Sequence, residues 1–308
     1  MATTTGRTRR RIAARLAAAA VAAVLAGTAV PAFAADTPST PSPFTLAQAV
    51  KGKAGLAAAQ QDEEEKSRIR PLFAVDRSDR AWMYLRDGNG GLAGRLSLDG
   101  LDARGLKDGA FVDQDGDSAP DGMWLWDTRG SLQYGGEDGS FRVGGGWNIY
   151  DKVLSPGNLG GAKGGDLLAR DSSGTLYLYL GYGDGKLTSR YKVGGGWGQY
   201  TQIAGNGDLT GDSKADIVAR DKAGTLWLYK GTGNHKAPFA QRTKIGGGWN
   251  AYNTLLSIGD VDVDGKTDLL ARDGSGVLWL YKGTGNAATP YKQRVKIGGG
   301  WNTYRLLF

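Results

Sequence analysis

Loops rich in aspartate are the segments of this sequence best suited to chemistry. In residues 260–268, aspartates occupy the first, third, fifth and ninth positions, and residues 113–121 repeat that pattern. Alternate spacing in a tight turn directs the carboxylates inward, where they repel one another unless a cation compensates. Hard oxygen ligands at this density suit Ca²⁺. Counting a backbone carbonyl at the seventh position, the predicted ligands are Asp113, Asp115, Asp117, Ala119, Asp121, Asp260, Asp262, Asp264, Lys266 and Asp268.

Two further segments carry weaker versions of the loop. Residues 208–216 place a threonine hydroxyl at the third position, and the predicted ligands there are Asp208, Thr210, Asp212, Lys214 and Asp216. Residues 158–166 keep only Asn158 and Asp166, so no ion is expected in that loop. The alternative for every loop is that the aspartates cap turns and accept hydrogen bonds from backbone amides.

The sequence offers few residues that could catalyse a reaction. His235 is the only histidine and there is no cysteine, so neither a cysteine nucleophile nor a Ser–His–Asp arrangement is available without that one residue. Pairs of acids could hydrolyse glycosides, but their regular repetition favours a shared structural task, because one reaction needs one site. We therefore expect no catalytic residues and no enzymatic activity.

The elements that position these loops recur along the chain. Gly-Gly-Gly-Trp occurs at residues 144–147, 194–197, 246–249 and 298–301, with steps of 50, 52 and 52 residues. Self-similarity at this period indicates a solenoid or a propeller. Glycine in these segments is expected to permit a bulge or a turn where blades approach closely.

Each repeat contains four short apolar or alternating runs. In the last complete copy these are residues 254–258, 269–272, 277–281 and 293–297, and the third run is apolar on both faces. Four antiparallel strands in about 50 residues make one propeller blade. Five copies are recognisable, and the first lacks an opening strand that residues 304–308 could supply. The sequence predicts an all-β propeller of about five four-stranded blades closed by its C-terminal strand; an open array or a ring completed by a second chain is the alternative.

The tryptophans of the repeated motif have two interpretations. Their indoles could stack on sugars beside the adjacent amides, which makes Trp147, Asn148, Trp249, Asn250, Trp301 and Asn302 candidate ligand-binding residues. Alternatively, each indole packs against the adjacent blade. Solvent exposure of the indoles distinguishes the two. The Arg-Asp pairs at 170–171, 220–221 and 272–273 are expected to serve as scaffolding between blades, and Trp82, Trp227 and Trp279 are expected in the core.

From Pro71 to Phe308 the chain resembles the FG-GAP/VCBS repeat proteins, whose integrin-type blades bind calcium in such aspartate loops. The Gly-Gly-Gly-Trp-Asn-x-Tyr segments are also similar to the Gly-Gly-Trp-Asn motif of five-bladed tachylectins, which bind N-acetylated sugars. The first resemblance implies calcium sites in a propeller, and the second implies carbohydrate binding. Integrin-type propellers have seven blades, so the count of five departs from that pattern.

The N-terminal residues differ from the repeats. Residues 1–34 have five arginines, an Ala-rich apolar stretch and a small-x-small end, which predict a secretory signal peptide, with twin-arginine export or a membrane anchor as alternatives. Residues 35–70 have the composition of a linker or propeptide. Cleavage after residue 34 would lower the formal net charge from +7 to +2, which removes the main argument for nucleic-acid binding.

Together these features predict a secreted, monomeric, calcium-binding propeller that acts by binding. Carbohydrate is the first expected ligand, since weak repeated sites add up by avidity. The alternative is a protein-binding or cell-adhesion module of the integrin-propeller type.

Overall fold

The computed structural model describes residues 71–99, 101, 103–116, 120–136 and 139–308. The predicted signal peptide (1–34), the predicted linker (35–70), Asp117 and Ala119 lie outside these residues. Among the described residues, no helix is both long and apolar enough to span a membrane.

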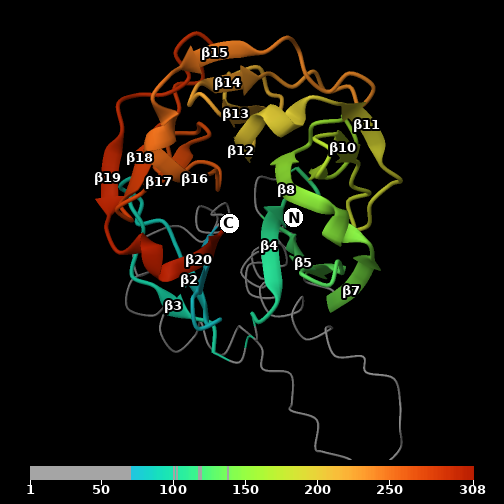
Figure 1. Cartoon of the computed structure of the whole chain (residues 1–308), viewed down its shortest axis with the longest axis horizontal. Helices are drawn as coiled ribbons and strands as arrows, with labels where there is room; N and C mark the ends of the chain where they lie inside the picture. The colour runs from blue at the N-terminus through green and yellow to red at the C-terminus, as the bar shows by residue number, and fades with distance from the viewer. Residues whose placement is uncertain (1–70, 100, 102, 117–119, 137–138) are drawn as a thin grey trace, which may run out of the picture.

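The described strands form five four-stranded antiparallel sheets arranged around a ring (Figure 1). The first blade contains β20 (Tyr304–Leu307), β1 (Leu72–Asp76), β2 (Ala81–Tyr84) and β3 (Leu96–Ser97). The second contains β4 (Leu106–Val112), β5 (Gly122–Asp127), β6 (Leu132–Gly136) and β7 (Gly139–Gly144). The third contains β8 (Tyr150–Gly157), β9 (Asp166–Asp171), β10 (Leu176–Tyr179) and β11 (Tyr191–Gly194). The fourth contains β12 (Tyr200–Ala204), β13 (Ile217–Asp221), β14 (Leu226–Tyr229) and β15 (Thr243–Gly246), and the fifth contains β16 (Tyr252–Leu256), β17 (Leu269–Asp273), β18 (Leu278–Tyr281) and β19 (Val295–Gly298).

The C-terminal strand closes the ring, as predicted. β20 pairs antiparallel with β1, with Ala74 opposite Leu307. The backbone amide of Phe73 donates to the carbonyl of Phe308 at 2.8 Å, and their rings stack at 4.7 Å between centroids. Closure covers the edge of β1, which would otherwise offer unpaired backbone groups to another chain. The architecture is therefore an all-β propeller of five blades.

A short 3-10 turn leads from the second, third, fourth and fifth blades into the first strand of the next blade around the ring, and the last of these turns enters β20 of the first blade. These turns are η2 (Trp147–Ile149), η3 (Trp197–Gln199), η4 (Trp249–Ala251) and η5 (Trp301–Thr303). The glycine before each tryptophan has a left-handed φ between 80° and 85°. Only glycine adopts this conformation without strain, which explains the last glycine of every Gly-Gly-Gly-Trp motif.

The apolar core lies between neighbouring blades. Cluster residues from the fourth blade, such as Leu226 and Leu228, pack with Leu255 and Leu269 of the fifth around Trp249. The arginine of each predicted scaffold pair also bridges blades: Arg220 donates to the carbonyl of Trp249 at 3.0 Å. The prediction for these arginines is confirmed.

The third strands are sandwiched between neighbouring blades, as expected, although one face is only half-buried in β2, β14 and β18. In β14 and β18 the leucines are buried, whereas Trp227 and Trp279 are only half-buried, and Trp82 in β2 is likewise half-buried. Alternate residues of such a strand face the two neighbouring blades: Leu226 and Leu228 join the cluster shared with the fifth blade, and Trp227 packs against the cluster shared with the third.

Candidate metal centres

Three groups of aspartates come together in the loops between the first and second strands of their blades. The groups are Asp113, Asp115 and Asp121; Asp208, Asp212 and Asp216; and Asp260, Asp262 and Asp268. In each group, one carboxylate oxygen from every residue lies within 4.8 Å of the others. The structure therefore brings together most of the carboxylates that the sequence singled out.

The ninth-position aspartate joins its loop to the hairpin that follows. The carboxylate of Asp268 accepts hydrogen bonds from the backbone amides of Val261 at 2.8 Å and Gly283 at 2.7 Å. Asp216 makes the equivalent bonds to Leu209 and Gly231. These aspartates thus have the backbone-capping role that was the alternative to metal binding.

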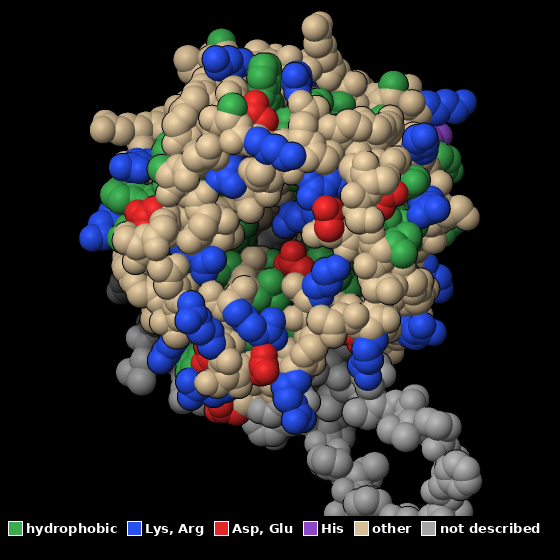
Figure 2. Space-filling model, viewed as in Figure 1, with side chains coloured by type: hydrophobic (Ala, Val, Ile, Leu, Met, Phe, Trp, Pro, Cys, Tyr) green, Lys and Arg blue, Asp and Glu red, His purple; other side chains and the backbone are tan. Residues whose placement is uncertain are grey.

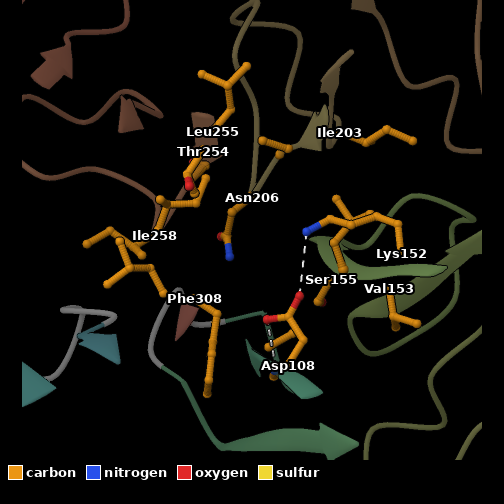
Figure 3. Close-up of a pocket in the computed structure, with 18 of the residues that line it drawn as sticks. Asp108, Lys152, Val153, Ser155, Ile203, Asn206, Thr254, Leu255, Ile258 and Phe308 are labelled. Atoms are coloured by element: carbon orange, nitrogen blue, oxygen red, sulfur yellow. Dashed lines mark hydrogen bonds and ion pairs between the residues drawn. The ribbon is translucent and has the colours of Figure 1, made fainter. Parts of the chain in front are cut away.

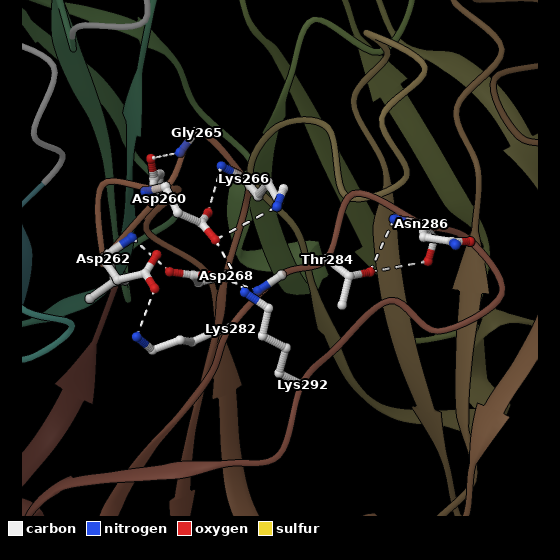
Figure 4. Close-up of polar contacts among 12 residues, drawn as sticks. Asp260, Asp262, Gly265, Lys266, Asp268, Lys282, Thr284, Asn286 and Lys292 are labelled. Carbon is white, nitrogen blue, oxygen red and sulfur yellow. Dashed lines mark hydrogen bonds and ion pairs between the residues drawn. The ribbon is translucent and has the colours of Figure 1, made fainter.

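Asp262 has bonding capacity that the protein does not use. One of its carboxylate oxygens pairs with the ammonium of Lys282 at 2.8 Å (Figure 4). Its other oxygen, Oδ1, is buried and has no hydrogen-bond partner, and the side chain is 8% exposed. A buried carboxylate oxygen without a partner is costly, and a cation between Asp260, Asp262 and Asp268 would satisfy it. The donor set of this loop therefore fits a hard cation.

Electrostatics in the same loop also favour an ion. Burial raises the pKa of Asp268 to about 6, against the lowering effect of its two amide donors, and the neighbouring charges of Asp262 and Asp260 raise it further. Burial likewise raises the pKa of Asp260. Carboxyls whose charged forms are disfavoured in this way become easier to ionise beside a positive charge.

Asp264, the predicted fifth-position ligand, does not belong to this group. Its carboxylate lies 3.5 Å from the ammonium of Lys292 and 3.8 Å from that of Lys266 (Figure 4). The equivalent Asp212 does join its group, although it also pairs with Lys230 at 3.1 Å. Burial raises the pKa of Asp216, and the hydroxyl of Thr210 beside it is buried with no hydrogen-bond partner among the described residues. Carbonyl ligation by Lys214 and Lys266 stays a prediction.

The remaining two loops follow the sequence pattern. In residues 113–121 the carboxylate of Asp121 accepts from the amide of Gln114 at 2.7 Å, and that of Asp113 from Gly116 at 2.7 Å. In residues 158–166 the buried Asp166 accepts from Leu159, Gly160 and Gly181 at 2.7 to 3.0 Å. Asn158 replaces a carboxylate there, and the described residues of that loop form no acidic group.

The four repeated tryptophans are buried. Trp147, Trp197, Trp249 and Trp301 are each 6% or 7% exposed. Each indole packs on a tyrosine of the blade that follows; for Trp249 the ring of Tyr281 lies 4.7 Å away between centroids. These indole faces are covered by protein, so they cannot stack on a sugar, and their burial is what packing between blades predicts.

The amides beside these tryptophans are more accessible. Asn148 and Asn250 are exposed, and Asn302 is half-buried. The amide of Asn250 donates to the carbonyl of Lys222 at 3.2 Å, and that of Asn302 to Gly274 at 3.1 Å. Asn250 and Asn302 thus hold turns of the preceding blade, and no described residue donates a hydrogen bond to their side-chain carbonyl oxygens.

Residues 208–271 match the family model of the FG-GAP-like repeat. The matched segment includes two of the three acidic groups, at residues 208–216 and 260–268.

Solved structures that resemble this propeller are distant in sequence. AofleA from Arthrobotrys oligospora is 10% identical, with a TM-score of 0.43 over 75% of this chain and 69% of that chain. Human WBSCR16 is 12% identical, with a TM-score of 0.33 over 74% and 64%. BBS1N, solved in complex with ARL6DN, is 10% identical, with a TM-score of 0.39 over 73% and 63%. No curated protein matches the chain in sequence.

A central cavity that the sequence did not predict lies where the first strands of the propeller meet (Figure 3). It has a volume of about 210 Å³. Asp108 and Lys152 form an ion pair at 3.6 Å on one side, and Asn206, Thr254 and Phe308 line the rest (Figure 3). Burial raises the pKa of Asp108, while Lys152 opposes that rise. The available signal was a polar residue at the third position of several first strands, such as Asp108, Lys152 and Thr254, but only the ring geometry brings them together.

Proposed function

We propose that this FG-GAP-like propeller is a secreted, calcium-binding module that binds a macromolecule and catalyses no reaction. The observation that carries the proposal is the recurrence of one acidic group in the equivalent loop of three blades. Repetition of a site around a ring is typical of a structural ion, whereas one reaction needs one site.

Calcium suits these loops better than magnesium does. The groups combine carboxylates with available backbone carbonyls on loops, and Ca²⁺ accepts six to eight oxygens in flexible geometry, while Mg²⁺ demands a compact octahedron. The residues that would hold the ions are the nine aspartates of the three groups. A bound ion would offset the repulsion between carboxylates and fix loops that have no core of their own. Sites with dissociation constants of about 0.1–1 mM would suffice outside the cell.

The nature of the macromolecular ligand follows partly from the tryptophans. Burial of all four indoles removes the stacking surfaces that sugar binding at the Gly-Gly-Gly-Trp-Asn segments requires. Burial is instead the arrangement that the protein-binding alternative expected. Carbohydrate binding therefore needs a different surface of the propeller.

Thermal unfolding tests the calcium proposal. We expect the full chain to melt several degrees higher in millimolar CaCl₂ than in excess chelator, because an ion bound only by the folded state stabilises it by mass action. Asp260→Asn removes the first carboxylate of one group and should shrink that difference. Equal concentrations of MgCl₂ should give a smaller shift.

Asn158→Ala supplies a matched control at the same loop position in the blade that lacks an acidic group. Its amide oxygen accepts a hydrogen bond from Gly161 at 2.9 Å, so the variant should lose a little stability equally with and without calcium. Melting curves of the parent that coincide in calcium and in chelator would refute the proposal.

A further inference from the structure

Three consecutive blades carry the same group of basic and aromatic side chains on their outer two strands. In the third blade Arg190 lies over the ring of Tyr177, with the guanidinium carbon 4.3 Å from the ring centroid. The fourth and fifth blades repeat this contact at 4.1 Å, and a lysine pairs across the strands with each aromatic residue. We call these the basic clusters; their members are Arg190, Tyr177 and Lys192; Arg242, Trp227 and Lys244; and Arg294, Trp279 and Lys296.

Each arginine is held in one orientation by two contacts. Besides stacking on the aromatic ring, Arg190 donates from Nη1 to the hydroxyl of Tyr150 at 2.9 Å. Arg242 and Arg294 make the same bond to Tyr200 and Tyr252, the residues that begin the first strands of their blades. A guanidinium fixed in this way loses little side-chain entropy when its remaining N–H groups bind a ligand.

Among the described residues, none of the three arginines or three lysines of the basic clusters forms an ion pair. The nearby carboxylates of Asp221 and Asp273 instead accept hydrogen bonds from the indoles of Trp227 and Trp279, each at 2.8 Å. The bond from Trp227, and to a smaller extent the charge of Arg242, lowers the pKa of Asp221. The planar guanidinium of an arginine can donate two parallel hydrogen bonds to a carboxylate or sulfate group, and the ammonium of the neighbouring lysine adds a second positive charge.

The position of the basic clusters favours a flexible polymer as their ligand over a flat surface such as a membrane. β11, β15 and β19 lie at the periphery of consecutive blades (Figure 1), and the space-filling view shows Lys and Arg along the rim (Figure 2). Because the clusters lie on successive blades around the rim, a planar membrane cannot reach all three at once. A flexible linear polyanion can follow the arc and gain avidity from successive contacts.

The aromatic rings of the basic clusters argue against single-stranded nucleic acid. Proteins that bind it without sequence preference stack bases on open aromatic faces. Here an arginine lies over each ring, and the rings of Tyr177, Trp227 and Trp279 also pack against core clusters. We propose that the three basic clusters together bind an anionic polysaccharide that carries carboxylate or sulfate groups.

The other two blades indicate where the surface ends. In the first blade Arg95 stacks on Trp82 at 4.0 Å, but Ser97 takes the place of the lysine. In the second blade Gln133 takes the place of the aromatic residue and pairs across the strands with Arg142. The binding surface is thus an arc over the third to fifth blades.

Binding of heparin and of hyaluronan to the calcium-loaded full chain tests this inference. We expect both polymers to bind at low ionic strength and neutral dextran not to bind. The triple variant Lys192→Gln, Lys244→Gln, Lys296→Gln should bind heparin roughly tenfold more weakly and with a flatter salt dependence, because fewer counterions are released. The matched triple Lys163→Gln, Lys186→Gln, Lys236→Gln removes the same charge from exposed loop positions, and its affinity should stay within about twofold of the parent.

Three results would overturn the inference: no binding of either polymer, equal weakening by both triple variants, or tighter binding of a thymidine oligonucleotide that displaces heparin. The inference extends the proposed binding role but does not depend on the aspartate groups. Calcium-dependent melting of the same samples distinguishes the two proposals. A protein that responds to calcium but binds no polymer would contradict polysaccharide binding by the basic clusters and leave the calcium proposal intact.

Discussion

At the scale of residues, the sequence predicts which side chains could bind a metal ion better than it predicts the other contacts of those side chains. The spacing in residues 260–268 correctly indicated that Asp260, Asp262 and Asp268 converge. It could not indicate that Asp264 turns away, because the lysine that attracts it, Lys292, follows 28 residues later in another hairpin. Nor did it show that the ninth aspartate is already bonded to backbone amides, since those amides come partly from a glycine 15 residues away.

Asp166 provides a test of this buried carboxyl arrangement that is independent of calcium ligation. Burial raises its pKa to about 6 from 3.8, although three backbone amides oppose the rise. Between about pH 4 and 6 the folded state therefore binds a proton that the unfolded state has released. The stabilising contribution of Asp166 is present below pH 4 and is lost as the pH rises through 6.

We expect the free energy of unfolding of metal-free protein to fall between pH 4.5 and 7, with Asp166 contributing about 1–3 kcal/mol of the change. Asp166→Asn should be less stable overall, because its amide N–H₂ meets backbone N–H donors, but its stability should depend less on pH. Denaturant unfolding at both pH values measures the effect. A variant with the same pH dependence as the parent would show that Asp166 does not titrate in this range.

At the scale of elements, the repeat predicts the strand order and the turns, but it does not predict which side chains are exposed to solvent. The Gly-Gly-Gly-Trp period correctly located the turns between blades and the closing strand. Burial of the repeated indoles depends on tyrosines of the following blade, such as Tyr281 against Trp249, and no local pattern reveals that contact. The sequence also did not show that Arg242, the residue just before β15, lies over the half-exposed ring of Trp227.

The turn before Trp249 can be tested with two neighbouring glycines. Gly248 has a φ of 85°, so Gly248→Ala forces a left-handed alanine and should cost about 1–2 kcal/mol of stability. Gly247 has no positive φ, and a Cβ added there meets nothing within 4 Å, so Gly247→Ala should be nearly neutral. Urea unfolding of the two variants measures the difference. Equal effects would mean that backbone conformation does not explain the conserved position of this turn within the repeat.

At the scale of the whole molecule, ring closure and the acidic loops belong to one arrangement. Five blades packed face to face place the loops that carry the acidic groups around the central axis, and a pocket there is lined by Asp113, Asp208 and Asp260. The sequence predicted the number of blades and the closing strand, because the repeats can be counted and the first copy lacks the strand that the C-terminus supplies. It could not predict the cavity or the basic arc, which arise from packing blades at fixed angles.

Calcium stoichiometry tests the central claim most directly. Metal-free full-length protein would be dialysed to equilibrium against 1–2 mM CaCl₂, a concentration on the order of that expected to fill weak extracellular sites, and bound metal would be measured by elemental analysis. Three acidic groups predict three calcium ions for each chain, and Asp260→Asn should lower that number by about one. A chain that binds no calcium under these conditions would contradict the account.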